Sequence, residues 1–248
     1  MSKVIINADD FGYSRGVNFG IIDAHQKGVL SSTTIMANMP GFGHAVCLAK
    51  DNPDLGIGVH LTLTCGCPLL NTVPSIITET GEFHHLSFYE NKFEIDMQEL
   101  YMEWEAQIEK VFAQGIQPTH LDSHHHVNSI TGITEVFVKL ARRYQLPVRN
   151  NFSVPEDLKT TNRFYATFDR LACEKPIWQH MNRNNLLQEC ETYELVEVMC
   201  HPGYIDDELL NRSSFSNNRP YIIKELMNEK YPELFKEYHI QLNTYADI

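Results

Sequence analysis

Apolar residues follow two patterns along the chain, and together these predict strands that alternate with helices. Short, near-continuous apolar runs predict buried strands at residues 3–8, 33–38, 55–61, 118–122, 146–150 and 193–200. Apolar residues at three- to four-residue spacing predict helices at residues 17–27, 96–114, 133–144 and 219–231. Strands that alternate with helices in this way form parallel sheets. We therefore predict an α/β fold. Between residues 151 and 193 the apolar residues follow neither pattern, so no element is predicted there.

The number of strand–helix units favours a barrel over an open sheet. About seven such units in 248 residues fit one domain spanning 1–248, folded as a distorted (β/α) TIM-like barrel of mostly parallel strands. The region 66–95 interrupts this pattern with a long irregular segment that contains Phe83, Phe88 and Tyr89. Long loops in compact domains are usually functional, so we expect this segment to form a pocket wall or a dimer contact.

Composition and charge narrow the class of protein. An apolar fraction of 43% with 21% charged residues is ordinary for a globular protein. The formal charge of −12 argues against binding to nucleic acid or to an anionic membrane, because both need clustered Lys and Arg. The chain has no apolar run of the roughly 20 residues that cross a bilayer. Its first residues start a strand at once, so we expect a cytoplasmic protein.

Four polar clusters stand where predicted strands end. Asp9 and Asp10 follow the first strand, His60 ends the third, residues 120–126 (HLDSHHH) end the fourth, and His201 follows the last. The carboxyl ends of parallel strands meet at one face, which is where α/β proteins gather their catalytic groups. Carboxylates and imidazoles are the side chains of a divalent-metal site with an acid/base pair. The clusters therefore predict a metal-dependent hydrolase.

Each cluster also has a purely structural interpretation. One carboxylate of the pair Asp9-Asp10 could cap the next helix, and the other could bind a metal or accept a proton. His60 could be a buried core histidine, and His201 could belong to a simple His-Pro-Gly turn. Arg149, at the end of a predicted strand, could pair with Asp9 and keep it ionised, or could be a surface cation.

The HLDSHHH segment is the most specific local signal, since it holds four histidines and an aspartate within seven residues. Strand alternation predicts that His120 and Asp122 point inward together, with His124 on the loop beyond. Imidazoles at this density suit metal ligands and the groups that support them. Not all can bind one ion, so we expect His125 and His126 to line the pocket.

These segments resemble the YdjC-type carbohydrate deacetylases, a family that includes the chitooligosaccharide deacetylases. The resemblance covers essentially the whole chain and is carried by NADDFG, the Ser-Thr-Thr run at 32–34, GIGVHLTLT, PTHLDSHHH, EVMCHPGYID and the closing TYADI.

The resemblance implies a distorted (β/α) barrel that removes acetyl groups from disaccharides containing N-acetylglucosamine. By the same resemblance, the metal ligands are Asp10, His60 and His124. Asp9 is implied to be the catalytic base and His201 the catalytic acid.

Further expectations concern the surroundings of the site. Arg149, Asp122, His120 and His125 are expected to contact the substrate or support the ligands. Two imidazoles and one carboxylate suit Zn²⁺, Mn²⁺ or Co²⁺, whereas the family resemblance implies Mg²⁺. We expect a small acetylated oligosaccharide as substrate and a homodimer as assembly. The alternatives are a different metal-dependent barrel hydrolase, such as a phosphoesterase, and a non-catalytic protein that binds acetylated sugars.

Overall fold

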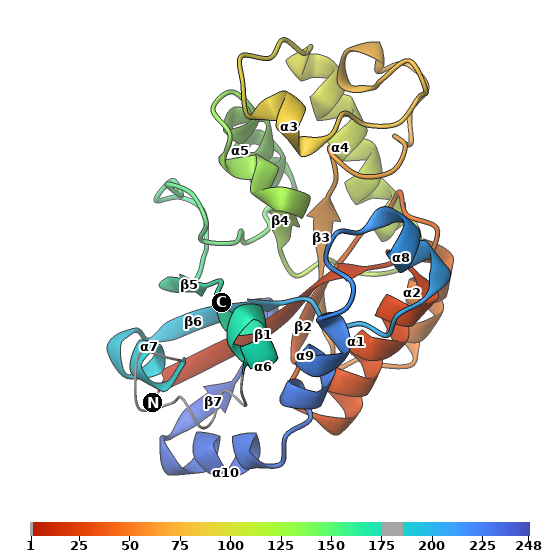
Figure 1. The fold of residues 1–248 in the computed structure, drawn as a ribbon. Coiled ribbons are helices and arrows are strands. Elements are labelled where there is room, and N and C mark those ends of the chain that lie inside the picture. The colour runs from red at the N-terminus through yellow and green to blue at the C-terminus, as the bar shows by residue number, and fades with distance from the viewer. Residues whose placement is uncertain (1, 175–185) are drawn as a thin grey trace.

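A computed structural model describes residues 2–174 and 186–248, whose strands form one parallel sheet surrounded by helices (Figure 1). The strands are β1 (Ser2–Phe11), β2 (Ser32–Ile35), β3 (Gly56–Leu61), β4 (Leu121–Ser123), β5 (Arg163–Tyr165), β6 (Leu195–Cys200) and β7 (Ile240–Leu242). They pair in the order β4-β3-β2-β1-β6-β5, and β7 pairs with the start of β1. Every pairing is parallel, which confirms the predicted α/β class.

The two edges of this sheet are joined by single bridges, so the sheet curls into a distorted barrel. Val148 makes one parallel bridge to Leu121 at the start of β4 and another to Thr160, just before β5. The strand predicted at 146–150 is therefore reduced to a single residue that pairs in parallel on both sides. Pro147 lacks the N–H that would extend the pairing toward the amino end. The predicted barrel itself is confirmed in its distorted form.

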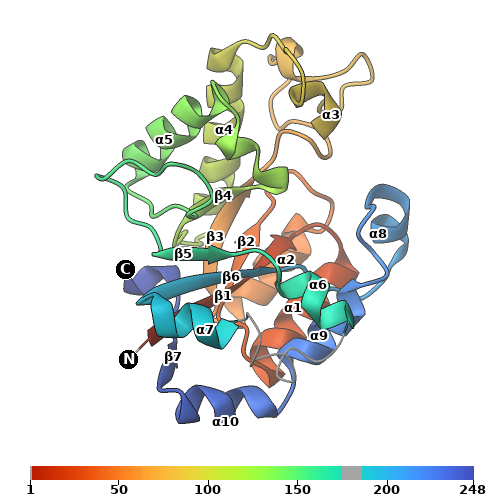
Figure 2. The same cartoon turned by 60° about the vertical axis from the view of Figure 1, so that its left-hand side comes forward.

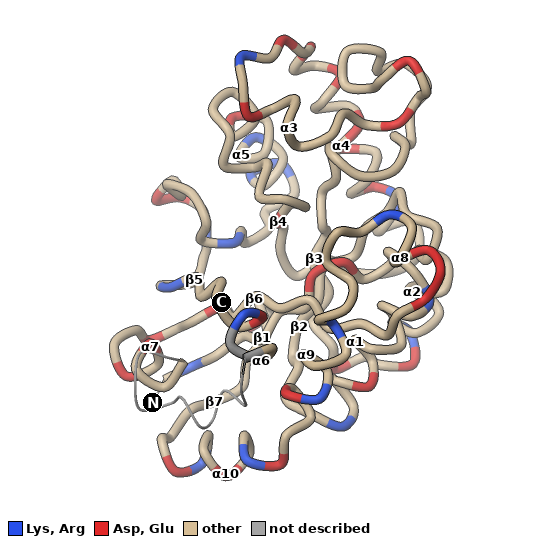
Figure 3. The backbone as a smooth tube through the Cα atoms, viewed as in Figure 1, with Lys and Arg blue, Asp and Glu red and all other residues tan. Residues whose placement is uncertain are grey.

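Helices cover the outside of the sheet in both views (Figures 1 and 2). The helices are α1 (Arg15–Lys27), α2 (Phe42–Lys50), α3 (Leu86–Tyr89), α4 (Met97–Phe112), α5 (Ile133–Tyr144), α6 (Phe168–Glu174), α7 (Leu186–Thr192), α8 (Asp207–Arg212), α9 (Arg219–Leu226) and α10 (Lys230–Glu237). Short 3₁₀ turns lie at Pro74–Ile76, His124–Ser129 and Tyr245–Asp247. Among the described helices, each is too short or too polar to cross a membrane. Lys and Arg are interspersed with Asp and Glu over these elements (Figure 3).

Local capping explains where the predicted helices begin and break. Ser14 caps α1 by accepting a hydrogen bond from the backbone N–H of Val17, so neither aspartate of the pair in β1 serves as that cap. The helix predicted at 219–231 is two helices. Asn228 lies between α9 and α10, and its side-chain oxygen accepts from the N–H of Lys230, the first residue of α10. Asparagine at this position ends one helix and starts the next.

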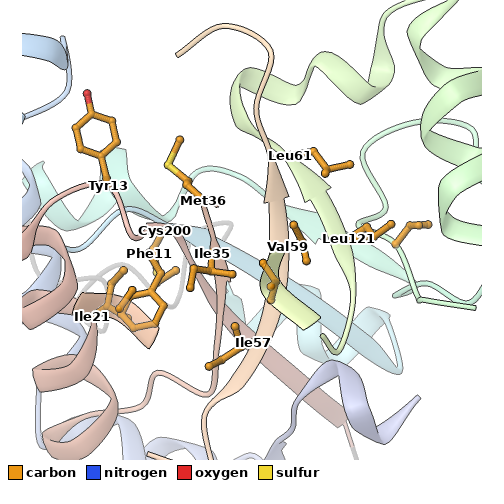
Figure 4. Close-up of a cluster of buried hydrophobic side chains, with 14 of the residues drawn as sticks. Phe11, Tyr13, Ile21, Ile35, Met36, Ile57, Val59, Leu61, Leu121 and Cys200 are labelled. Carbon is orange, nitrogen blue, oxygen red and sulfur yellow. The ribbon is translucent and has the colours of Figure 1, made fainter. Parts of the chain in front are cut away.

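The main hydrophobic core lies between the sheet and the helices, and a small second cluster is formed by Ile5, Leu195 and Tyr245. Ile35, Val59 and Leu61 belong to the apolar cluster on the outer face of the strands (Figure 4). His60, between two of them, points to the other face and contacts polar groups there. Gly58 precedes it on that inner face, where a Cβ atom would lie 2.5 Å from the His120 ring. The barrel interior is therefore polar, and one position in β3 must lack a side chain.

The segment 66–95 is fixed to α4 by carboxylates that accept backbone hydrogen bonds. Glu103 is buried and accepts from the N–H groups of Leu69 and Leu70 at 2.9–3.0 Å. Phe83 and Tyr89 are buried inside the segment. The segment is thus ordered, and its buried aromatic residues join the main hydrophobic core.

Candidate active site

The predicted clusters meet at one cavity of about 670 Å³ at the carboxyl end of the strands. Asp9 and Asp10 from β1, His60 from β3, His124 after β4 and His201 after β6 all line it. These five residues span almost 200 positions of the chain. The parallel order of the strands brings them together, as expected for a barrel.

A bulge in β1 turns both adjacent aspartates into this cavity. Strict alternation would send Asp9 and Asp10 to opposite faces. Between Ala8 and Phe11, however, the register with β2 slips, because three steps along β1 match two steps along β2, from Thr33 to Ile35. Asp10 has a φ of 72° there, a left-handed conformation that aspartate tolerates better than most residues. The backbone strain at this position is the cost of placing two carboxylates in one site.

Three side chains form a group with the geometry of a metal centre. Ligand atoms of Asp10, His60 and His124 lie within 4.8 Å of one another. The Oδ1 atom of Asp10 is 3.1 Å from Nδ1 of His124 and 3.6 Å from Nε2 of His60. Ligands at about 2.0–2.2 Å from one ion are separated by roughly 3.0–3.5 Å, so these distances fit a common ion.

The other contacts of the three ligands support the same interpretation. Among the described residues, Oδ1 of Asp10 is a buried atom with no hydrogen-bond donor. Nδ1 of His60 donates to the Asp122 carboxylate at 2.6 Å, which leaves its Nε2 facing Asp10. A carboxylate behind a histidine in this way fixes the ring for metal binding. His60 is thus not merely a core histidine.

Surplus negative charge surrounds His60. Burial alone would lower the pKa of His60, but Asp122, Asp9 and Asp10 outweigh burial and raise the pKa to about 9. A raised pKa measures the attraction of the site for positive charge, whether proton or metal. The chemistry of the donor set and the charge balance both fit a divalent cation.

Asp9, His60 and Asp122 form a second group of potential metal ligands. Here the positive charge is supplied by the side chain of Arg149. Arg149 is fully buried and donates to both oxygens of Asp9 at 2.6 and 2.8 Å. The same guanidinium lies 2.9 Å from Asp122. Arg149 is therefore no surface cation, and it occupies the position that an ion would need in this second group.

Arg149 is held in turn by residues from the far end of the barrel. Glu197 in β6 accepts from its Nε at 2.9 Å, and the Tyr245 hydroxyl donates to Glu197 at 2.5 Å. Burial raises the pKa of Glu197 to about 7, against the opposing effect of Arg149. His120, which points inward with Asp122 as predicted, stacks on the Tyr245 ring at 3.8 Å. His120 therefore supports the barrel interior and does not reach the cavity.

His201 lines the same cavity as Asp9 and Asp10 and is held by Asp169 of α6. Its Nδ1 is 2.6 Å from Asp169, and its Nε2 is 3.9 Å from Oδ2 of Asp9. Burial alone would lower the pKa of His201, but Asp169 outweighs burial and the pKa is raised. An imidazole with one nitrogen bound to a carboxylate and the other facing a cavity is suited to donate a proton.

His125 and His126 adopt left-handed backbone conformations, both with a φ of 55°. His125 stacks on His124 at 3.9 Å and pairs with the Thr64 hydroxyl at 2.9 Å. Both line the cavity, as expected from the sequence. Because of this turn, the three consecutive histidines 124–126 all line the same cavity.

Two loops form the mouth of the cavity. His85, Leu86 and Ser87 contribute the wall from segment 66–95. The expected aromatic wall is not found, because Phe83 and Tyr89 are buried within that segment, and Phe88 stacks on His84 and does not line the cavity. The opposite wall comes from residues 212–215, between α8 and α9. The two walls approach each other at Arg212 and Glu82, whose charged atoms are 3.7 Å apart.

Sequence reasoning missed the residues that hold the site from a distance. Asp169 lies in a stretch without a clear apolar pattern. Arg219 is the first residue of a helix whose sequence contains no motif that indicates a functional site. Arg219 donates to Oδ2 of Asp10 at 2.7 Å, which leaves Oδ1 for a metal. Glu197 gave the one usable signal, because a carboxylate inside the apolar run LVEVMC must have a buried partner.

Comparisons with known proteins agree along the full chain. Curated carbohydrate deacetylases from Geobacillus stearothermophilus and Clostridium beijerinckii are 41% and 37% identical to it. The matches cover 98% and 99% of this chain, and 96% and 100% of those proteins. A solved structure from Enterococcus faecalis V583, provisionally described as a cellobiose-phosphate cleavage protein, has a TM-score of 0.85 at 34% identity. That match covers 99% of this chain and 98% of the other.

The family model gives the same result as the individual relatives. Residues 3–236 match the model of YdjC-like proteins, and this range includes all five side chains that meet at the carboxyl end of the barrel. With a match to the family model over residues 3–236 and relatives at 37% and 41% identity, the chain belongs to the YdjC-like protein family.

Proposed function

We propose that this protein is a metal-dependent carbohydrate deacetylase that releases acetate from disaccharides containing N-acetylglucosamine, of the chitobiose type. The observation that carries the proposal is the convergence of Asp10, His60 and His124 beside Asp9 and His201 in one cavity. The curated relatives named as carbohydrate deacetylases support the same activity.

Asp10, His60 and His124 would hold the metal ion. A divalent ion bound there supplies Lewis acidity, which makes a water more acidic and polarises the acetyl carbonyl group. Two imidazoles favour Zn²⁺, Mn²⁺ or Co²⁺ by ligand type, and the family resemblance favours Mg²⁺. Elemental analysis of protein purified without added metal decides among them.

Asp9 is proposed to accept the proton of the attacking water. Burial alone would raise the pKa of Asp9, but Arg149 outweighs burial and keeps the carboxylate ionised at every working pH. A carboxylate with a lowered pKa is a weak base, so it needs an acidified water as its partner. This requirement couples Asp9 to the neighbouring metal site.

His201 is proposed to protonate the leaving amine. A sugar amide expels a very poor anion unless its nitrogen gains a proton as the C–N bond breaks. Asp169 raises the pKa of His201, so the imidazole is charged over a wider range of pH. Asp9 and His201 thus act from neighbouring positions, 3.9 Å apart, as base and acid.

The size and walls of the cavity favour a short substrate. A volume of about 670 Å³ is typical of small-molecule sites and suits a disaccharide. The wall formed by His85, Leu86 and Ser87 limits access from one side. A homodimer remains part of the proposal, and sedimentation velocity tests it.

The decisive experiment measures acetate release from N,N′-diacetylchitobiose before and after chelation. We expect turnover that disappears with chelator and returns with a divalent ion. Phosphatase activity on an aryl phosphate without acetate release would favour the phosphoesterase alternative. Tight binding of the sugar by metal-loaded protein without turnover would favour the sugar-binding alternative.

Replacing His201 with alanine should affect good leaving groups less than poor ones. We expect kcat to fall by about 10²–10⁴-fold on the sugar amide, the usual scale for loss of a general acid. The loss should be much smaller on an aryl acetate, whose leaving group needs no proton. Equal losses on both substrates would mean that His201 positions the substrate instead.

The variant Asp169→Asn serves as a companion to this measurement. It keeps a hydrogen-bond partner for His201 but removes the charge that raises the pKa. Activity that depends on protonated His201 is lost as pH rises through the pKa of that group. The alkaline limb of kcat should therefore move to lower pH in the variant, and an unmoved limb contradicts the acid role.

A further inference from the structure

Arg219 lies in the wall of the cavity with one of its nitrogens unused. Its Nη2 donates to Oδ2 of Asp10 at 2.7 Å, and its Nε donates to the carbonyl oxygen of Phe215 at 2.7 Å. Its Nη1 is buried and has no hydrogen-bond partner in the described part of the chain. Arg219 as a whole is 2% exposed and lines the cavity.

The surroundings of Arg219 prevent the guanidinium from turning to another partner. It is the first residue of α9, and its Cζ lies 6.0 Å from the Tyr13 ring and 5.7 Å from the Phe215 ring. Its stem passes Gly203 so closely that a Cβ there would be 3.2 Å from Cδ. The glycine of the His-Pro-Gly motif therefore makes room for Arg219, beside His201.

An unused donor on a buried cation is costly. A buried donor without a partner gives up the hydrogen bonds that it makes with water in the unfolded chain, and this penalty is larger when the group is charged. Nη1 shares its carbon with Nη2, so it lies directly beside Asp10, one of the three candidate metal ligands. This donor therefore lies close to the group formed by Asp10, His60 and His124, where a bound molecule could supply the missing acceptor.

We propose that Nη1 of Arg219 binds an oxygen of the acyl group, both in the substrate as it reacts and in the acetate product. This inference rests on the proposed deacetylation. In that reaction, water adds to the carbonyl carbon, the C–N bond breaks, and the amine nitrogen gains a proton. The acyl oxygens carry the developing negative charge and end as the carboxylate of acetate.

The charge of the guanidinium favours an acyl oxygen over a sugar hydroxyl. An anionic oxygen adds direct Coulomb attraction to its hydrogen bond with a charged N–H donor, and a neutral oxygen lacks this attraction. Sugar hydroxyls stay neutral throughout, whereas the acyl oxygen becomes anionic in the transition state. Asp10 and Arg219 are almost fully buried, whereas the side chain of Arg212 in the same cavity is 47% exposed, so the sugar is expected to extend from the buried pair toward Arg212.

The variant Arg219→Lys separates the two contacts of this side chain. One ammonium group can still pair with Asp10, but it cannot also occupy the position of Nη1. We expect near-normal metal content, a kcat on the disaccharide lower by about 10²-fold, and a KM within about threefold. Arg142→Lys is the matched control, because Arg142 also pairs with a carboxylate, Asp157, but lies outside the cavity.

A second measurement needs no turnover. Acetate labelled with ¹³C is titrated into chelated and metal-loaded protein, and binding is followed by NMR. We expect Arg219→Lys to bind acetate about tenfold more weakly than wild type in both forms, as for the loss of one charge-assisted hydrogen bond. Arg142→Lys should bind acetate as wild type does.

Every outcome decides the inference. Unchanged acetate binding and unchanged kcat in Arg219→Lys would overturn it. A raised KM with normal kcat would assign Nη1 to a sugar hydroxyl, and loss of metal from the folded variant would reduce Arg219 to a positioning residue for Asp10. If the wild type releases no acetate from any sugar, the proposed function fails. The acetate titration still tests whether Nη1 of Arg219 binds a carboxylate, because it needs no turnover.

Discussion

Asp9→Asn is expected to keep its metal and lose at least about 10²-fold in kcat, whereas Asp10→Asn is expected to lose the metal first. Asparagine preserves the shape of Asp9 and one oxygen acceptor for Arg149, but it cannot take a proton. Loss of a general base lowers rates by about 10²–10⁴-fold. Asp10 instead supplies the one carboxylate oxygen between His60 and His124.

The two variants are compared by metal content per chain and by acetate release at saturating metal. Asp157→Asn is the matched control, since this aspartate pairs with an exposed arginine far from the cavity. We expect Asp10→Asn to recover part of its activity when metal is added in excess, because its acid/base pair is intact. The reverse behaviour, with metal lost in Asp9→Asn only, would exchange the two roles within the same site.

The side chains that meet in the cavity were predictable because they follow strands. His60 and the HLDSHHH segment stand at the ends of β3 and β4, and parallel pairing places His60 opposite Asp122. That register needs only the apolar pattern of the two strands. The same reasoning brought His201 to the site, since β6 pairs with β1 along its whole length.

What could not be predicted depends on contacts between elements distant in sequence. The bulge at Asp10 arises where the register of β1 and β2 slips, and no periodic pattern encodes it. Asp169 and Arg219 reach the site from helices whose apolar faces determine their packing, so their own polar side chains carry no positional signal. The prediction that Phe83 lines the cavity was wrong, because this residue forms an antiparallel bridge with Ile77 in the same segment and is buried there.

The polar interior of the barrel gives the site its rigidity. Asp9 is held by Arg149, and Arg149 is held by Glu197. Glu197 is held by Tyr245 from the turn that closes the far end of the barrel. A carboxylate fixed by such a chain of buried charged hydrogen bonds keeps one geometry relative to Asp10, His60 and His124. The stability of the barrel and the position of Asp9 therefore depend on the same central residue, Arg149.

Arg149→Met is accordingly expected to destabilise the protein by about 3–5 kcal/mol at neutral pH, the scale for removing one partner of a buried ionic network. Methionine fills much of the volume of arginine but leaves Asp9, Asp122 and Glu197 buried without their common cation. Urea denaturation of the chelated protein measures the loss. Arg163→Met, which breaks the exposed pair with Glu189, should cost less than about 1 kcal/mol.

The sign of the pH dependence separates this explanation from a simple packing defect. In the wild type, Arg149 outweighs burial and lowers the pKa of Asp9 and of Asp122. That contribution is present above the ordinary aspartate pKa and is lost as pH falls through the lowered values. Without Arg149, burial alone raises the pKa of these carboxylates, so the variant loses stability as pH rises through the raised values.

The free-energy difference between Arg149→Met and wild type should therefore be larger at pH 8 than at pH 5. Adding Glu197→Gln should restore part of the stability at pH 8, because it removes one of the buried charges that Arg149 had neutralised. In the wild-type background the same change should destabilise, since Arg149 then loses a partner. A deficit that is equal at both pH values, and that Glu197→Gln does not relieve, would show that the arginine acts only by filling space.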